Sequence, residues 1–359
     1  MNVVFRVDSS TAIGSGHLMR CLALAESLDK NGVEITFICR DLGGNLTDEI
    51  KHRQMKVITL PCPEFAIKAE ADIYSNSLGV RQLVDAHETA VSIGNEIKPD
   101  WLIVDHYSIG EEWENYISNY CSKIMVIDDL ANRKHYCHLL LDQNYSSENN
   151  DRYKVLTPSF CRFLLGPQYS LLRSEFGALR RSDVSFKSAI KRLLIFFTAG
   201  DDQGETLKAM NGVKIFSKNK RIDVDVVVGS ANLYQQPIEE MCSVHNWGYH
   251  CQVNYMPALI AGADIVIGSG GSSNWERCAL GVPGLVVILA ENQAAIARDL
   301  DSAGVVINLG WNTRLESIDY ASALAAIGPE KLNFMSLAAY QMVDGAGASR
   351  VSDSLKLYF

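Results

Sequence analysis

The sequence predicts a two-domain α/β protein in which each domain is built on a doubly wound, parallel sheet. Short apolar strands alternate with amphipathic helices through both halves of the chain, which is the pattern of parallel βα units. The 359 residues exceed what one ordinary hydrophobic core accommodates, and an apolar content of 47% is enough to fill two cores. We expect an N-terminal domain over 1–172, a linker over 173–191 and a C-terminal domain over 192–359.

Each predicted element rests on its local hydrophobic pattern. In the N-terminal half, the predicted strands span 3–7, 35–39, 101–105 and 124–127, and the predicted helices span 18–28, 46–53, 80–97 and 112–121. In the C-terminal half, the predicted strands span 193–197, 224–228, 264–267, 285–289 and 305–309, with helices between them. Open α/β sheets bind ligands at the carboxyl ends of their strands, so we expect a ligand cleft where the facing strand ends of the two domains meet.

A glycine loop near the N-terminus joins the first strand to the first helix and carries a histidine. Gly14 and Gly16 form the turn, and His17 stands at the start of the helix, one turn before Arg20. The backbone N–H groups of such a turn point at an anion above it, and the positive helix end disfavours an imidazolium. A neutral imidazole accepts a proton, so we predict that His17 is a catalytic base and that Gly14, Gly16 and Arg20 contact substrate.

A dinucleotide fingerprint is the main alternative for this loop. Gly14 and Gly16 begin the pattern G-x-G-x-x-G, and Asp41 follows the second predicted strand. Met19 occupies the position of the third glycine, however, where a bulky side chain hinders close helix packing. The residues therefore favour a histidine-dependent reaction over a nicotinamide or flavin enzyme.

A second loop, rich in glycine and serine, follows the predicted strand 264–267 and is interpreted as an anion cradle. Small residues let backbone amides approach a diphosphate closely, and serine hydroxyls add donors. A carboxylate one turn into the next helix can accept both ribose hydroxyls, and an Asn-Gln pair follows the next strand. The predicted substrate-binding residues of this half are Met256, Gly270, Gly271, Ser272, Ser273, Glu276, Asn292 and Gln293.

Two further strand ends carry polar residues whose interpretation stays open. At the end of strand 101–105, Asp105 either serves chemistry or caps the next helix, and Tyr107 is a predicted substrate contact. At the start of the second half, Gly200 and Asp201 are predicted to hold the ligand, although a turn with a helix N-cap explains this loop nearly as well.

Composition and spacing exclude several classes. A net charge of −9 argues against a nucleic-acid partner, and nine scattered cysteines without a C-x-x-C pair fit a reducing cytoplasm. We expect no membrane span, because the longest apolar run, 279–290, is too short. Asp105, His106, Asp128, Asp129, His135 and His138 lack metal-ligand spacing, and no G-x-S-x-G elbow is present, so neither a metal hydrolase nor a serine hydrolase is expected.

Five motifs together resemble the UDP-2,4-diacetamido-2,4,6-trideoxy-beta-L-altropyranose hydrolases of pseudaminic acid biosynthesis, a route to flagellin glycosylation. The motifs are RVDSSTAIGSGHLMRCLALA, IVDHY, GPQYSLLRSEF, GSGGSSNWE and ENQ, beginning at residues 6, 103, 166, 268 and 291. The resemblance implies a GT-B fold like that of the MurG-type glycosyltransferases, with no metal or cofactor. It also implies a catalytic role for His17 and substrate contacts from Tyr107, Asn292 and Gln293.

Two features depart from the family pattern. Ala199-Gly200-Asp201-Asp202 stands where the family has Gly-Gly-x-Asp, and the chain carries an insertion around 68–77 and extra C-terminal residues. The predicted reaction is attack of water on the anomeric carbon of a UDP-sugar, with inversion and loss of UDP. A GT-B glycosyltransferase that uses a hydroxyl acceptor is the alternative, and a nucleotide-sugar binding protein without turnover is the third class.

Overall fold

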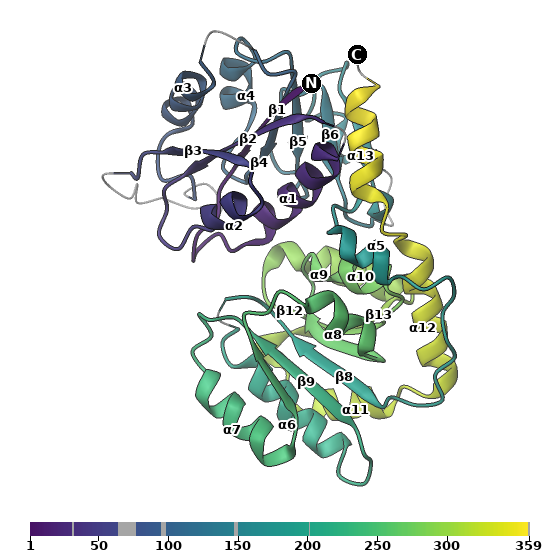
Figure 1. Ribbon diagram of the computed structural model, residues 1–359. Coiled ribbons are helices and arrows are strands. Elements are labelled where there is room, and N and C mark those ends of the chain that lie inside the picture. Colours follow the sequence, from purple (N-terminus) through teal and green to yellow (C-terminus); the bar gives the residue numbers. More distant parts are fainter. Residues whose placement is uncertain (31, 64–76, 95–97, 147–149, 201, 358–359) are drawn as a thin grey trace. The chain divides into compact units, whose positions relative to one another are not determined.

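The computed structural model of the protein describes residues 1–30, 32–63, 77–94, 98–146, 150–200 and 202–357 (Figure 1). The chain forms two compact units, which we call unit 1 and unit 2. Unit 1 comprises 1–173 together with 346–359, and unit 2 comprises 174–345. The C-terminal residues had been expected in the second domain, so that assignment is wrong. The linker predicted over 173–191 is not a separate segment, because residue 173 ends the first part of unit 1 and residues 174–191 belong to unit 2, beginning with the helix Ser174–Leu179.

Unit 1 is built on a seven-stranded parallel sheet in the order β3-β2-β1-β4-β5-β6-β7. The central strands are buried on both faces, because successive side chains such as Trp101, Leu102, Ile103 and Val104 point to opposite faces and are all buried. The strands are β1 (Asn2–Val7), β2 (Glu34–Arg40), β3 (Lys56–Leu60), β4 (Trp101–Asp105), β5 (Lys123–Ile127), β6 (Leu139–Asp142) and β7 (Arg162–Leu165).

Helices cover both faces of the unit 1 sheet. They are α1 (Gly16–Asp29), α2 (Thr47–His52), α3 (Gln82–Ile93), α4 (Glu111–Ile117) and α13 (Gly347–Lys356), with short 3₁₀ turns at Asn150–Tyr153 and Pro167–Tyr169. One apolar core joins the sheet to α1 and α13, and the other joins it to α3 and α4. The C-terminal α13 lies beside α1, and its Leu355 carbonyl accepts a hydrogen bond from Trp101 Nε1 at 3.1 Å (Figure 1).

Unit 2 repeats the architecture with a six-stranded parallel sheet in the order β10-β9-β8-β11-β12-β13. The strands are β8 (Arg192–Phe196), β9 (Asp223–Val228), β10 (Gly248–Cys251), β11 (Ile265–Ser269), β12 (Gly284–Ile288) and β13 (Val306–Trp311). The helices are α5 (Ser174–Leu179), α6 (Glu205–Phe216), α7 (Gln235–His245), α8 (Met256–Gly262), α9 (Ser273–Ala279), α10 (Ala294–Ser302), α11 (Ser317–Ala325) and α12 (Pro329–Met342). Its main core joins the sheet to α6, α7 and α11.

The predicted α/β class with two parallel sheets is confirmed, and four strands were not predicted. β3, β6, β7 and β10 are only four or five residues long, and each completes a sheet whose central strands were predicted. Within the described part of the chain, no helix combines the length and the apolar character that a membrane crossing requires.

Candidate active site

The loop between β1 and α1 places His17 at the carboxyl edge of the unit 1 sheet. Gly14 has a φ of +82° and donates its N–H to the Ser10 carbonyl at 2.8 Å, so the turn uses the left-handed region that glycine tolerates. A Cβ added to Gly14 or Gly16 would meet no other atom within 4 Å, so the protein itself leaves space beside both glycines. His17, the second residue of α1, is 8% exposed.

Asp105 orients the His17 ring. Its Oδ1 lies 2.6 Å from His17 Nδ1, and because an ionised carboxylate only accepts, Nδ1 carries the proton and donates it. Burial opposes ionisation of Asp105, but the charge of Arg20 and the hydrogen bonds that Arg20 and His17 donate outweigh burial and hold the pKa of its carboxyl well below its usual range. Nε2 is therefore the nitrogen of neutral His17 that is left to accept a proton.

Arg20 joins Asp105 to a second carboxylate. Its Nε and Nη2 donate to the two oxygens of Asp105, each at 2.6 Å, and its Nη1 donates to Asp129 Oδ2 at 3.1 Å. Tyr107 lies edge-on to His17, with ring centroids 4.5 Å apart and ring planes at 84°. The structure thus brings the predicted residues His17, Arg20 and Tyr107 together. The guanidinium of Arg20, which was predicted to contact substrate, binds two carboxylates of the protein itself.

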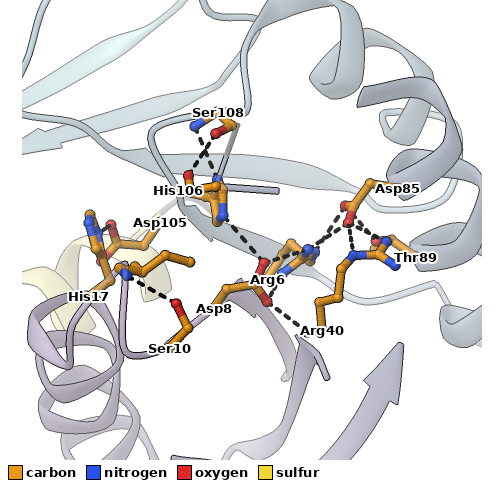
Figure 2. A network of polar contacts seen from close by, with 12 residues as sticks. Arg6, Asp8, Ser10, His17, Arg40, Asp85, Thr89, Asp105, His106 and Ser108 are labelled. Atoms are coloured by element: carbon orange, nitrogen blue, oxygen red, sulfur yellow. Dashed lines mark hydrogen bonds and ion pairs between the residues drawn. The ribbon is translucent and has the colours of Figure 1, made fainter. Parts of the chain in front are cut away.

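A buried charge network lies next to this cluster and fixes the ends of β1, β2 and β4 (Figure 2). Arg6 pairs with Asp8 and Asp85, with closest distances of 2.6 Å, and Arg40 pairs with Asp85 at 2.6 Å. Burial opposes ionisation of Asp8, yet Arg6 and His106 hold the pKa of that carboxyl well below its usual range. His106 Nε2 lies 3.3 Å from Asp8, so the residue beside Asp105 is anchored to the end of β1.

The glycine-serine loop of unit 2 joins β11 to α9 as predicted. The Gly270 N–H donates to the Val287 carbonyl at 3.2 Å, and a Cβ on Gly270 would approach the Gln293 Cβ to 3.0 Å. Gln293 Oε1 accepts from the Leu289 N–H at 3.0 Å, so this side chain holds the end of β12. Asn292 Oδ1 is buried and has no hydrogen-bond partner among the described residues, which leaves an acceptor available for a ligand donor.

Met256 and Glu276, two of the remaining predicted residues of unit 2, lie near the same loop. Met256, the first residue of α8, lines a small pocket together with Ser269 and Ser273, and Glu276 lies in the first turn of α9. Gly200 donates its N–H to Thr198 Oγ1 at 3.2 Å, whereas Asp201 lies outside the described residues. Asp202 caps α6 through the N–H groups of Gly204 and Thr206, at 3.0 and 3.1 Å. Asp202 thus satisfies N–H groups at the start of α6, whose N-cap residue is Gly204, so the alternative interpretation of this loop as a turn before a helix holds for Asp202.

His135 and His138, two of the candidate metal ligands in the sequence, form hydrogen bonds within the protein. His135 Nδ1 lies 2.7 Å from Glu114 Oε1, and His138 Nδ1 accepts from the Ile124 N–H at 3.2 Å. Among the residues that the structure describes, no group of three His, Cys, Asp or Glu side chains is arranged to hold a metal ion.

Two functional candidates were not predicted as partners of His17. The sequence pattern left Asp105 open as a chemical group or a helix cap, and it gave Asp129 no role beyond that of a candidate metal ligand. Both carboxylates stand at the ends of the neighbouring parallel strands β4 and β5, whose pairing brings them to one edge. A signal was present in the sequence, since acidic residues directly after adjacent buried strands share an edge with the glycine loop.

The fold is the two-domain, Rossmann-like GT-B fold of glycosyltransferases, as solved structures show. MurG of Acinetobacter baumannii matches with a TM-score of 0.66 and 12% identity, over 99% of both chains. The spinosyn rhamnosyltransferase SpnG, solved with thymidine diphosphate, matches with a TM-score of 0.62 and 14% identity, over 99% of this chain and 100% of SpnG. Identities this low establish the fold alone.

No protein-family model matches the chain. Three curated proteins are similar to it in sequence. An uncharacterised protein of Methanocaldococcus jannaschii is 25% identical, over 82% of this chain and 56% of that protein. The UDP-2,4-diacetamido-2,4,6-trideoxy-beta-L-altropyranose hydrolase of Campylobacter jejuni is 33% identical, over 49% of this chain and 53% of the hydrolase. The chain thus spans little more than half the length of these two relatives. The spore coat polysaccharide biosynthesis protein SpsG of Bacillus subtilis is 24% identical, over 99% of this chain and 98% of SpsG.

Proposed function

We propose that the chain is a nucleotide-sugar hydrolase that removes UDP from a diacetamido-trideoxy sugar, with UDP-2,4-diacetamido-2,4,6-trideoxy-beta-L-altropyranose as its substrate. The single observation that carries the proposal is the orientation of His17, whose Nδ1 is committed to Asp105 at 2.6 Å. A histidine held in this way accepts a proton only at Nε2, which is what a general base for water requires. The partial similarity to the Campylobacter hydrolase supports the choice of substrate.

In the proposed reaction, water attacks the anomeric carbon of the sugar. His17 Nε2 takes a proton from the water as the new C–O bond forms, and the bond from the anomeric carbon to the diphosphate oxygen breaks. UDP leaves with the electron pair of that bond, and the protonated His17 later gives its proton to solvent. Direct displacement inverts the anomeric centre, and a diphosphate needs little help from an acid because it is a stable anion.

Unit 2 supplies the groups proposed to hold the nucleotide. The amides over 271–273 and the hydroxyls of Ser272 and Ser273 would bind the diphosphate beside Gly270, whose own N–H donates to Val287. Glu276 would accept the ribose hydroxyls, and the unpartnered Asn292 Oδ1 would accept a donor of the substrate. Gly200, Asp201 and Met256 complete the proposed contacts. The proposed step uses no metal ion.

An anomer-resolved ¹H NMR time course with the UDP-sugar and EDTA tests the proposal. We expect UDP and free sugar in equal amounts, with the inverted anomer appearing first. UDP release that requires an added acceptor would instead identify a glycosyltransferase, the class of SpnG, which shares this fold. A substrate that stays intact would contradict both activities and favour a binding protein.

Replacement of His17 provides the residue-level test. We expect His17→Ala to lower kcat by about 10²–10⁴-fold, which is the usual contribution of a general base, while calorimetry shows UDP-sugar binding close to that of the wild type. His87→Ala is the matched control, because His87 is an exposed histidine of α3 in the same unit. Near-normal turnover of the His17 variant would rule out this residue as the base.

A further inference from the structure

Asp129 belongs to the His17 cluster, but it takes no part in the proposed proton transfer. It follows β5 as Asp105 ends β4, and these strands are neighbours in the sheet. Its side chain is only 15% exposed, and its Oδ1 is buried without a hydrogen-bond partner among the described residues. A carboxylate at this depth loses hydration free energy, so its presence calls for a compensating charge or donor.

The charges around His17 do not balance while the ring is neutral. The groups in contact with the ring are Arg20 from α1, Asp105 at the end of β4 and Tyr107 after β4. Asp129, which follows β5, is linked to the ring through Arg20. One guanidinium serves two carboxylates, so this cluster carries one net negative charge with neutral His17 and none once His17 is protonated. The cluster therefore matches the charge that His17 acquires during proton transfer.

Tyr107 ties Asp129 to the ring. Burial, followed by the charge of Asp129, raises the pKa of the Tyr107 hydroxyl well above its usual range. The phenol therefore keeps its proton, and the Asp129 Oδ1, which has no hydrogen-bond partner among the described residues, is an acceptor open to it. The same tyrosine ring meets His17 edge-on at 4.5 Å, so a contact at its hydroxyl controls the position of its ring.

We propose that Asp129 is a positioning residue that holds Tyr107 against His17 and supplies the second negative charge that balances Arg20 and a protonated His17. Only the kinetic part of this inference rests on the proposed function. The electrostatic part concerns the free protein and is tested without substrate.

An NMR titration of the His17 ring in the full chain tests the electrostatic part. In Asp129→Asn, we expect the ring signal to titrate at a pH lower by about half a unit or more, because the imidazolium loses a nearby opposite charge. Asp129→Glu keeps the charge and should titrate close to the wild type. A folded Asn variant that titrates like the wild type, or an equal shift in the Asn and Glu variants, would overturn the inference.

A double-mutant cycle tests the kinetic part. We expect Asp129→Asn and Tyr107→Phe each to lower kcat about tenfold with little change in KM, and the double variant to lose no more than the worse single variant, because the two residues act through one hydrogen bond. Losses that multiply would contradict the coupling. A wild type that releases no UDP would contradict the proposed function, and the NMR titration would then decide the inference about Asp129.

Discussion

At the scale of single residues, the site depends on which nitrogen of His17 carries the proton. Asp105 accepts from Nδ1 at 2.6 Å and is itself held by Arg20 through both of its oxygens. The guanidinium prevents the carboxylate from turning, and the carboxylate selects the ring tautomer. The nitrogen that acts as the base is therefore determined by Asp105, which lies outside the loop that carries His17.

Asp105→Asn should keep the geometry of the contact with His17 Nδ1 and change the tautomer of the His17 ring. The amide NH₂ can donate to Nδ1, which moves the ring proton to Nε2 and removes the acceptor of the base, so kcat should fall by about a hundredfold or more. ¹⁵N NMR of the ring measures the tautomer directly. His135, paired with Glu114 at 2.7 Å, is the internal reference and should not change. A normal tautomer together with lost activity would argue against this role.

Local patterns predicted His17 but not its partners. The strand, the glycine turn and the helix around His17 lie within one short segment, so spacing alone placed the ring at a strand end. Asp105 is 88 positions away from His17, and Asp129 is 109 positions away from Arg20. Contacts of that separation depend on the strand order β1-β4-β5, which a single sequence does not specify.

At the scale of elements, the local hydrophobic pattern predicted the longer apolar strands but not the shortest ones. The strands β1, β4, β8 and β12 are predominantly apolar, and the sequence pattern predicted their ends within one or two residues. β6, β7 and β10 have four residues each, too few for a pattern, and they form because a neighbouring strand offers unpaired backbone groups.

Close packing between α6 and α11 gives a prediction about Gly212. Alanine is favoured over glycine inside a helix by about 1 kcal/mol, but a Cβ on Gly212 would lie 2.5 Å from Tyr320 Cβ and 2.6 Å from the Ser317 carbonyl oxygen. Overpacking of this kind costs about 1–3 kcal/mol, so Gly212→Ala should lower the free energy of unfolding measured in urea.

Gly262→Ala is the matched control for that experiment, because Gly262 is also helical and lies in the same unit. Its added Cβ would have Arg192 Nη1 as its nearest atom at 3.8 Å, an ordinary contact. This variant should be as stable as the wild type or slightly more stable. A stabilised Gly212→Ala protein would show that α11 moves away at little cost.

At the scale of the whole molecule, the chain begins and ends in the same unit. After unit 2 is complete at Gly345, α13 returns to unit 1 and packs its buried Val351 and Leu355 against α1 and the sheet. The amphipathic pattern of α13 shows that one face is buried, but it does not show whether that face packs on the core of unit 1 or on the core of unit 2. The prediction therefore assigned α13 to the domain that precedes it in the sequence. The last turn of the chain therefore contributes to the unit that carries His17.

Leu355→Ala should accordingly weaken unit 1 and spare unit 2. Leu355 is fully buried, and truncation of such a leucine costs about 2–5 kcal/mol. Hydrogen exchange measured by mass spectrometry should show faster exchange in β1, β4 and α1, with unit 2 peptides unchanged. Leu357→Ala is the control, because Leu357 is 83% exposed and its truncation should leave every peptide unchanged. Equal loss of protection in both units would mean that they unfold together, and it would contradict an effect confined to unit 1.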